Sequence, residues 1–166
     1  MPARQAPGYE VRPARPQDID ALHALIRGLA EYEKLAHQAV GTPAQLQAEL
    51  FGPTPVIESA LLWEGERAVG FALWFHSFST FLGRRGLWLE DIFVQPGARG
   101  RGYGKALLRH CARIAVARGC GRFEWSVLDW NQPAIDFYRA CGAVLMEDWT
   151  TCRMTGAALA RFAAEH

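Results

Sequence analysis

The sequence predicts a mixed α/β fold whose sheet is mostly antiparallel and is flanked by helices. Three observations support this fold class. Short alternating or apolar stretches, typical of strands, come between stretches whose apolar residues recur at helical spacing. The polar turn at 64–67 joins two apolar stretches as a hairpin does. The glycine-rich segment 99–104 lies between a strand and a long amphipathic helix, which indicates a crossover to a later strand.

The first half of the chain is predicted to contain two helices and the antiparallel strands. Residues 9–12 alternate and form a short strand, and a helix begins near Asp18. The apolar stripe of this helix comprises Ile19, Leu22, Leu25, Ile26 and Leu29. Thr42 caps a second helix, with Pro43 at its first position and its end at 51–53. Three further strands are expected at 60–63, 68–75 and 86–94.

The second half is predicted to add two helices and two strands. Residues 103–118 form an amphipathic helix, which Gly119 or Gly121 ends. The remaining elements are a strand at 123–128, a short helix at 133–140 stopped by Gly142, and a last strand at 149–154. The predicted order is therefore β-α-α-β-β-β-α-β-α-β.

The composition restricts the class of protein and its partners. At 166 residues the chain fits one domain over 1–166, with 1–8 expected to be flexible. Lys and Arg number 18 and Asp and Glu 17, so broad binding to nucleic acid or to an anionic membrane is not expected. No apolar run approaches the ~20 residues of a bilayer span, and the N-terminus lacks the apolar core of a signal peptide. We therefore expect a cytoplasmic protein with four reduced cysteines: Cys111, Cys120, Cys141 and Cys152.

The glycine-rich segment has the features of a phosphate-binding loop. Its glycines lack the Cβ atoms that would keep a phosphate from the backbone amides: Gly100, Gly102 and Gly104. The helix that follows offers unpaired N–H groups and the positive end of its dipole. Three basic residues add positive charge: Arg99, Arg101 and Lys105. A tight turn with solvated basic residues is the alternative interpretation.

Two motifs resemble the signatures of the GCN5-related N-acetyltransferases (GNAT). Arg99-Gly100-Arg101-Gly102-Tyr103-Gly104 is similar to the acyl-CoA loop Q/R-x-x-G-x-G/A, and residues 131–138 are similar to a second signature that opens a helix. The predicted order of elements also resembles the family fold over nearly the whole chain. The resemblance implies a GNAT sheet with splayed central strands, a CoA loop, and acetyl-CoA as co-substrate. The histidines show no ligand spacing, so no metal is expected.

Three segments resemble a narrower group, the diamine N-acetyltransferases, which include spermidine/spermine and thialysine enzymes: 29–33, 88–94 and 129–133. This resemblance implies transfer of an acetyl group to a primary amine of a small diamine, polyamine or thialysine-like amino acid by direct attack. Segment 34–38 lacks the acidic pair expected of a strict polyamine enzyme. Arg84 and Arg85 favour an amino acid, because an arginine can bind its carboxylate.

The implied reaction needs a base and an acid. An alkylammonium has a pKa of about 10.4 and must lose a proton before it attacks, so Glu90 is the candidate base, acting through a water. Asp91 points to the opposite face of a regular strand, whereas a bulge would turn both carboxylates toward the site. The resemblance places Tyr138 beside the sulfur of CoA as general acid. Structural carboxylates and a core tyrosine are the alternative interpretations.

The cofactor-binding residues follow from the same resemblance. The pyrophosphate is expected at Arg99, Gly100, Arg101, Gly102, Tyr103, Gly104 and Lys105. A backbone N–H on the strand before the loop is expected to stabilise the thioester oxygen, and the same edge pairs with pantetheine: Ile92, Phe93 and Val94. Asn131 either hydrogen-bonds the pantetheine arm or caps its helix.

An acidic pocket is expected for the acceptor amine. Tyr32 and Glu33 match the pocket segment of the diamine group. Together, Glu33, Glu90 and Asp91 suit a substrate with two or more cationic nitrogens, and Trp88 offers an aromatic face to an ammonium group. A solvated helix end and a core tryptophan are the alternatives.

Other functions stay open from the sequence. Acetylation of protein or peptide amines would require an open groove, and a non-catalytic acyl-CoA-binding module would require only the loop. A dimeric scaffold is a third possibility. A homodimer is expected, with the tryptophans and the segment beyond Arg153 as its candidate interface.

Overall fold

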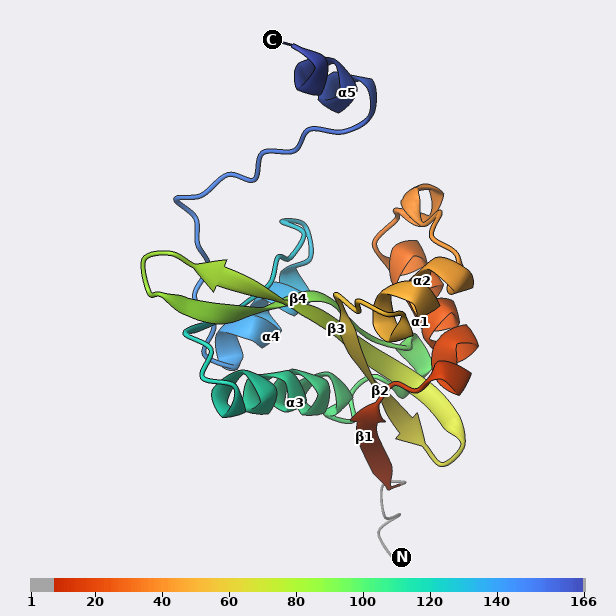
Figure 1. Ribbon diagram of the computed structural model, residues 1–166. Coiled ribbons are helices and arrows are strands. Elements are labelled where there is room, and N and C mark those ends of the chain that lie inside the picture. Colours follow the sequence, from red (N-terminus) through yellow and green to blue (C-terminus); the bar gives the residue numbers. More distant parts are fainter. Residues whose placement is uncertain (1–7, 166) are drawn as a thin grey trace, which may run out of the picture. The chain divides into compact units, whose positions relative to one another are not determined.

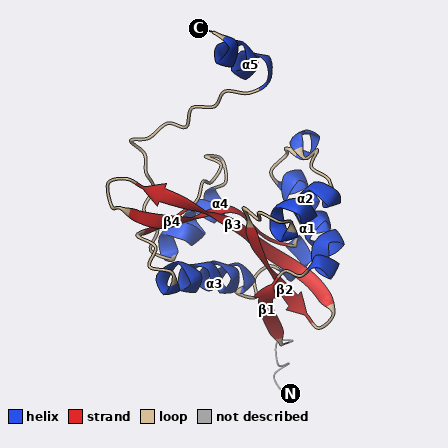
Figure 2. Cartoon of the chain, in the orientation of Figure 1, coloured by secondary structure: helices blue, strands red, loops and turns tan. Residues whose placement is uncertain are grey.

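The computed structural model describes residues 8–165, which form two compact units, one ending at Ser126 and the other beginning at Val127. Helices and strands are drawn in Figures 1 and 2, and each unit is described by itself. The flexibility expected for 1–8 falls on residues 1–7, which lie outside the described part. The single domain over 1–166 stays a prediction.

The first unit is built on a five-stranded sheet in the order β1-β2-β3-β4-β5. Its strands are β1 (Tyr9–Pro13), β2 (Glu58–Glu64), β3 (Arg67–Ser79), β4 (Arg84–Val94) and β5 (Arg122–Glu124). The first four pair antiparallel, and β5 pairs parallel with β4 after a helical crossover. This topology confirms the mixed, mostly antiparallel sheet that the sequence predicts.

Helices cover both faces of this sheet: α1 (Ile19–Tyr32) and α2 (Pro43–Phe51) on one, and α3 (Tyr103–Ala117) on the other (Figure 1). The apolar stripe of α1 packs into one core cluster with alternate residues of β3 such as Phe71 and Leu73. Trp74, the residue after Leu73, faces α3, where its ring meets His110. The period of two in the strand thus divides the apolar residues between two cores.

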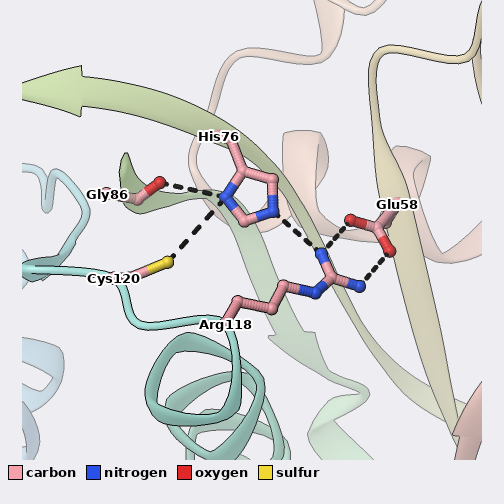
Figure 3. A network of polar contacts seen from close by, with 5 residues as sticks. All are labelled: Glu58, His76, Gly86, Arg118 and Cys120. Carbon is pink, nitrogen blue, oxygen red and sulfur yellow. Dashed lines mark hydrogen bonds and ion pairs between the residues drawn. The ribbon is translucent and has the colours of Figure 1, made fainter. Parts of the chain in front are cut away.

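Hydrogen bonds and ion pairs join helix α3 to β2 at both ends of the helix. At its start, Arg101 and the hydroxyl of Tyr103 both donate to Glu64, the last residue of β2. At its end, the Arg118 guanidinium forms a two-point ion pair with Glu58, the first residue of β2 (Figure 3). A helix of 15 residues and a strand of seven are both roughly 20 Å long, so the two elements match in length.

The pair between Arg118 and Glu58 belongs to a wider network (Figure 3). Arg118 also donates to His76 Nε2 over 2.8 Å, and His76 Nδ1 lies 3.1 Å from the carbonyl of Gly86. An arginine cannot accept a hydrogen bond, so Nε2 is the acceptor and Nδ1 carries the proton. Hydrogen bonding from Arg118 lowers the pKa of the Glu58 carboxyl. The network therefore joins three strands to the end of α3.

The second unit contains α4 (Gln132–Ala140) and α5 (Gly156–Ala164). Gly142, with φ of +97°, follows α4, and the Ala143 N–H bonds back to the carbonyl of Tyr138. This is the glycine stop that the sequence predicts.

Two predicted strands are wrong in whole or in part. No strand lies at 149–154 in the described chain; that segment is exposed and irregular and leads into α5, which was not expected. Thr150 and Thr151 are β-branched and favour a strand, but a strand also needs a partner. The alanine-rich run 156–164 favours a helix by intrinsic propensity. The strand predicted at 123–128 is limited to Arg122–Glu124, because β4 pairs with β5 only over Gly86–Trp88.

Within residues 8–165, no helix is both long enough and apolar enough to span a bilayer.

Candidate active site

A β-bulge in β4 places two carboxylates on one site. Leu73 of β3 is opposite Asp91, and the next residue, Trp74, is opposite Leu89, so Glu90 is the extra residue. A bulge breaks the period of two and re-aims the neighbouring side chains. Both Glu90 and Asp91 consequently line the same pocket, as the bulge considered at the sequence level would require.

The two carboxylates share this pocket with a third, Glu33, which follows the last residue of α1. We call it the carboxylate pocket; its other lining residues are Leu29, Leu89, Ile92, Trp125 and Ser126. The lining comes from α1, from β4 beyond its last pairing with β5, and from the chain just after β5. The pocket thus lies where β4 and β5 cease to pair, which is the splay that the fold prediction includes.

The carboxylates experience different surroundings. Burial, together with the negative charges of Glu90 and Glu33, raises the pKa of Asp91 to about 6. Burial also raises the pKa of Glu33. Glu90 is exposed, and Trp88 donates its indole N–H to Glu90 Oε2 over 3.0 Å. A pocket with this crowding of negative charge attracts a cation, and Asp91 is poised to gain or lose a proton near neutral pH.

Asp91→Asn is expected to stabilise the fold in a pH-dependent way. Because the folded pKa of about 6 lies above the ordinary 3.8, the folded state carries an unfavourable ionised carboxylate above pH 6. As the pH falls from 6 through 3.8 the group becomes protonated in both states and this cost fades. Urea denaturation should show a gain in unfolding free energy of about 2 kcal/mol at pH 8 and little gain at pH 4. The exposed Glu90→Gln should gain less; an equal gain for Asp91→Asn at both pH values would contradict a charge effect.

The loop between β4 and α3 leaves backbone amides open at the start of a helix. Gly100 and Gly102 have φ of +77° and +78°, a left-handed conformation that favours glycine, and a Cβ at either would meet no atom of the described chain within 4 Å. The first hydrogen bond of α3 runs from the Ala106 N–H to the Gly102 carbonyl, and no side chain caps the helix. Three N–H groups at the helix start, on Tyr103, Gly104 and Lys105, therefore have no partner within the helix. Open backbone amides at a helix N-terminus suit an anionic group such as the CoA pyrophosphate.

The basic residues of the loop have different partners. Arg101 pairs with Glu64 and donates to the Gly97 carbonyl, so it holds the loop in shape. Arg99 donates its Nε–H to the Val94 carbonyl over 3.0 Å, and its guanidinium lies 4.3 Å from the centre of the Tyr32 ring. Lys105 is exposed on the first turn of α3. The hydroxyl of Tyr103 is bound to Glu64, so this side chain supports the loop.

The last residues of β4, before the loop, place one side chain in the core and have one backbone edge that does not pair with β5. Phe93 is 5% exposed and packs in the cluster with α1, while Ile92 and Val94 are partly buried. Since β5 pairs with β4 only as far as Trp88, the backbone of Ile92–Val94 has no strand beside it on that edge within the described chain. An open strand edge is what an extended amide-bearing arm pairs with.

Two further predicted residues lie in the second unit. Asn131 caps α4 by accepting a hydrogen bond from the Ala134 N–H over 3.4 Å, which is one of the two roles expected for it. Tyr138 lies on α4, is largely buried, and its ring contacts Phe137. Both contacts lie within the second unit.

Not every residue predicted for the acceptor meets the carboxylate pocket, and other residues were missed. Glu33, Glu90 and Asp91 line it, whereas Trp88 holds Glu90 and Tyr32 contacts Arg99. Three residues were not predicted: Glu64, which anchors the loop, and the pocket residues Trp125 and Ser126. The strand predicted at 123–128 could have indicated Trp125 and Ser126. A strand that follows the crossover lies beside β4, so the residues at its end lie where the two strands separate. Among the described residues, no three His, Cys, Asp or Glu side chains form a group that could hold a metal.

The mixed sheet with a glycine loop before α3 is the class of fold found in acetyltransferases, and comparison with known families agrees. The model of the acetyltransferase (GNAT) family matches residues 23–143. The chain belongs to this family and is an N-acetyltransferase. The family fold implies acetyl-CoA as its co-substrate.

Relatives and solved structures extend this assignment. Thialysine N-epsilon-acetyltransferase of Bos taurus is 37% identical over 166 residues, covering 93% of this chain and 97% of the bovine protein. L-ornithine N5-acetyltransferase of Arabidopsis thaliana is 32% identical, covering 90% of this chain and 85% of the plant protein. An integron cassette protein of V. cholerae is 25% identical with a TM-score of 0.80, covering 95% of this chain and 98% of the other. An aminoglycoside acetyltransferase from a soil metagenome shares the fold, with a TM-score of 0.76 at 16% identity, covering 89% of this chain and 95% of its own.

Proposed function

We propose that the protein transfers the acetyl group of acetyl-CoA to a primary amine of a small diamine, polyamine or thialysine-like amino acid by direct attack. The observation that carries this proposal is the carboxylate pocket. Glu33, Glu90 and Asp91 converge there at the bulge of the strand that runs into the glycine loop. Three carboxylates beside a cofactor loop favour a cationic acceptor.

The same carboxylates prepare the amine for attack. An alkylammonium with a pKa of about 10.4 is under ~1% neutral at pH 7, so the proton must be removed at the site. Glu90 is the proposed base, through a water: its side chain is exposed to solvent, and Trp88 holds one of its oxygens. Asp91 and Glu33 attract the cation and keep it in the pocket.

Acetyl-CoA supplies an activated acetyl group on a thioester. The amides of Arg99–Lys105 are proposed to bind its pyrophosphate, and the edge of Ile92–Val94 its pantetheine arm and thioester oxygen. Asn131 is proposed to assist from α4 in addition to capping it. Tyr138 donates a proton to the departing sulfur, since a phenol of pKa near 10 is a suitable acid for a thiolate.

The names of the relatives favour an amino acid with a side-chain amine as the acceptor. Thialysine and ornithine enzymes match over most of this chain. Arg84 and Arg85 lie at the exposed start of β4 and do not line the carboxylate pocket, so the preference for an amino acid rests on the relatives and not on these two residues. A screen of thiol release from acetyl-CoA with diamines, polyamines, lysine analogues, ornithine and aminoglycosides tests this directly. Acceleration by side-chain amines supports the proposal; CoA binding without acceleration by any amine would instead support a binding module.

Glu90→Gln is expected to lower kcat/KM about 100-fold at pH 8, since a positioned base contributes on that order. The low-pH limb of the profile should also move to lower pH, because the charge of Glu90 helps raise the pKa of Asp91. Both effects are read from kcat/KM measured between pH 5 and 9 with saturating acetyl-CoA. A kcat/KM at pH 8 that stays at the wild-type value would assign the base role to Asp91 or to bulk water.

The protein is further proposed to be a cytoplasmic homodimer formed from one domain per copy. All four cysteines are free, which suits a reducing compartment. Phe78 and Phe81, on the hairpin between β3 and β4, are 64% and 96% exposed, and large exposed aromatic residues favour a partner surface. The mass in solution from light scattering tests this: twice the chain mass of 18.5 kDa is expected, and a monomer at micromolar concentration would contradict it.

A further inference from the structure

Arg99 forms a contact that its place in the glycine loop does not predict. The guanidinium lies over the Tyr32 ring, 4.3 Å from its centre, and 5.6 Å from the centre of the Phe93 ring. Its Nε–H donates to the Val94 carbonyl at the end of β4. Three contacts to one side chain fix the direction of the guanidinium toward α1.

The partner of this contact stands next to the carboxylate pocket. Tyr32 is the last residue of α1, and the following residue, Glu33, lines the pocket together with Leu29 one turn earlier. Glu33 N–H and Leu35 N–H bond back to the carbonyls of Leu29 and Ala30, so the chain leaves α1 in a fixed direction. A side chain that holds Tyr32 therefore holds the wall of the pocket as well.

We propose that Arg99 is a positioning residue for the acceptor amine: it ties the end of α1 to the end of β4 and so keeps Glu33 at the pocket. This inference rests on the proposed amine acetyl transfer. It changes the role that the loop motif assigns, because the pyrophosphate is then bound by backbone amides and by Lys105. Two of the three cations of the loop, Arg99 and Lys105, consequently serve two different substrates.

The kinetic test compares matched substitutions of these two cations. Arg99→Gln is expected to raise the KM of the best amine from the screen about 5-fold to 10-fold, the scale of one lost cation–π contact, with kcat and the CoA Kd within about 2-fold of the wild type. Lys105→Gln is expected to do the reverse, weakening CoA about 5-fold and leaving the amine KM unchanged. Arg99→Lys should recover most of the amine KM, since it keeps a cation over the ring.

A double-mutant cycle identifies the ring as the partner. Arg99→Gln should have its full effect on amine KM in Tyr32→Phe, which keeps a ring, and almost none in Tyr32→Leu, which removes it. The same cycle measured on urea-denaturation midpoints without any substrate should show the same coupling.

The outcomes separate this inference from the function on which it rests. If no amine is acetylated, the proposed function fails, whereas the denaturation cycle still tests the contact. If Arg99→Gln weakens CoA and leaves the amine KM unchanged, the positioning role is overturned and the acetyl transfer stands. Full additivity of Arg99 and Tyr32 substitutions in both readouts would also overturn it.

Discussion

Replacing Tyr138 by phenylalanine is expected to lower kcat about 100-fold while the Kd of CoA changes little. The substitution removes one hydroxyl, and with it the proton that the proposed mechanism delivers to the departing CoA sulfur; general acids contribute roughly this factor. The ring remains, so its contact with Phe137 and the burial on α4 are preserved. Steady-state rates with the best amine and calorimetric titration of CoA measure the two quantities separately.

The control for this result is Tyr9→Phe, a tyrosine on β1 that is half exposed and whose ring meets Tyr103. It loses the same atom and should keep the wild-type rate. An unchanged rate in Tyr138→Phe would remove the acid role and leave the tyrosine as a packing residue.

Gly102→Val is expected to weaken CoA binding about 100-fold or more without unfolding the protein. At φ of +78° a β-branched residue is strained, by about 1–2 kcal/mol, and its methyl groups occupy the approach to the open amides. Two charge-assisted hydrogen bonds lost at the pyrophosphate account for a factor of this size. CoA titration and a thermal melt are the measurements.

Gly97→Val provides the matched control in the same loop. Gly97 is also in open space, and its φ is not in the left-handed region. It should retain CoA affinity within a few fold. If Gly102→Val binds CoA as well as Gly97→Val does, the pyrophosphate does not lie at the start of α3.

The elements that follow from local periodicity were predictable, and those that need a distant partner were not. The stripe of α1, the Thr42 cap and the bounds of β3 and β4 follow from residues near one another in the chain, and the structure reproduces them to within a few residues. The strand predicted at 149–154 is wrong because the β-propensity of a segment does not show whether another strand lies beside it. The alanine-rich residues 156–164, which follow this segment, form α5 because alanine has a high helix propensity.

The same limit applies to the candidate site. The glycine loop and the adjacent carboxylates could be recognised because they are contiguous. Charge alone could not reveal that Arg101 is committed to Glu64, 37 residues away, or that Arg99 lies on Tyr32. Which cation stays available to a ligand depends on sheet register, which the chain fixes only through tertiary packing.

The carboxylate pocket also has a consequence for turnover. In the proposed reaction an amine enters as a cation, attracted by Glu33, Glu90 and Asp91, and leaves as an acetamide that carries no charge at the reacted nitrogen. The attraction that gathers the substrate would then be absent for that nitrogen in the product. We therefore expect acetylation to weaken binding in the pocket, so that the acetylated product inhibits less than the amine binds.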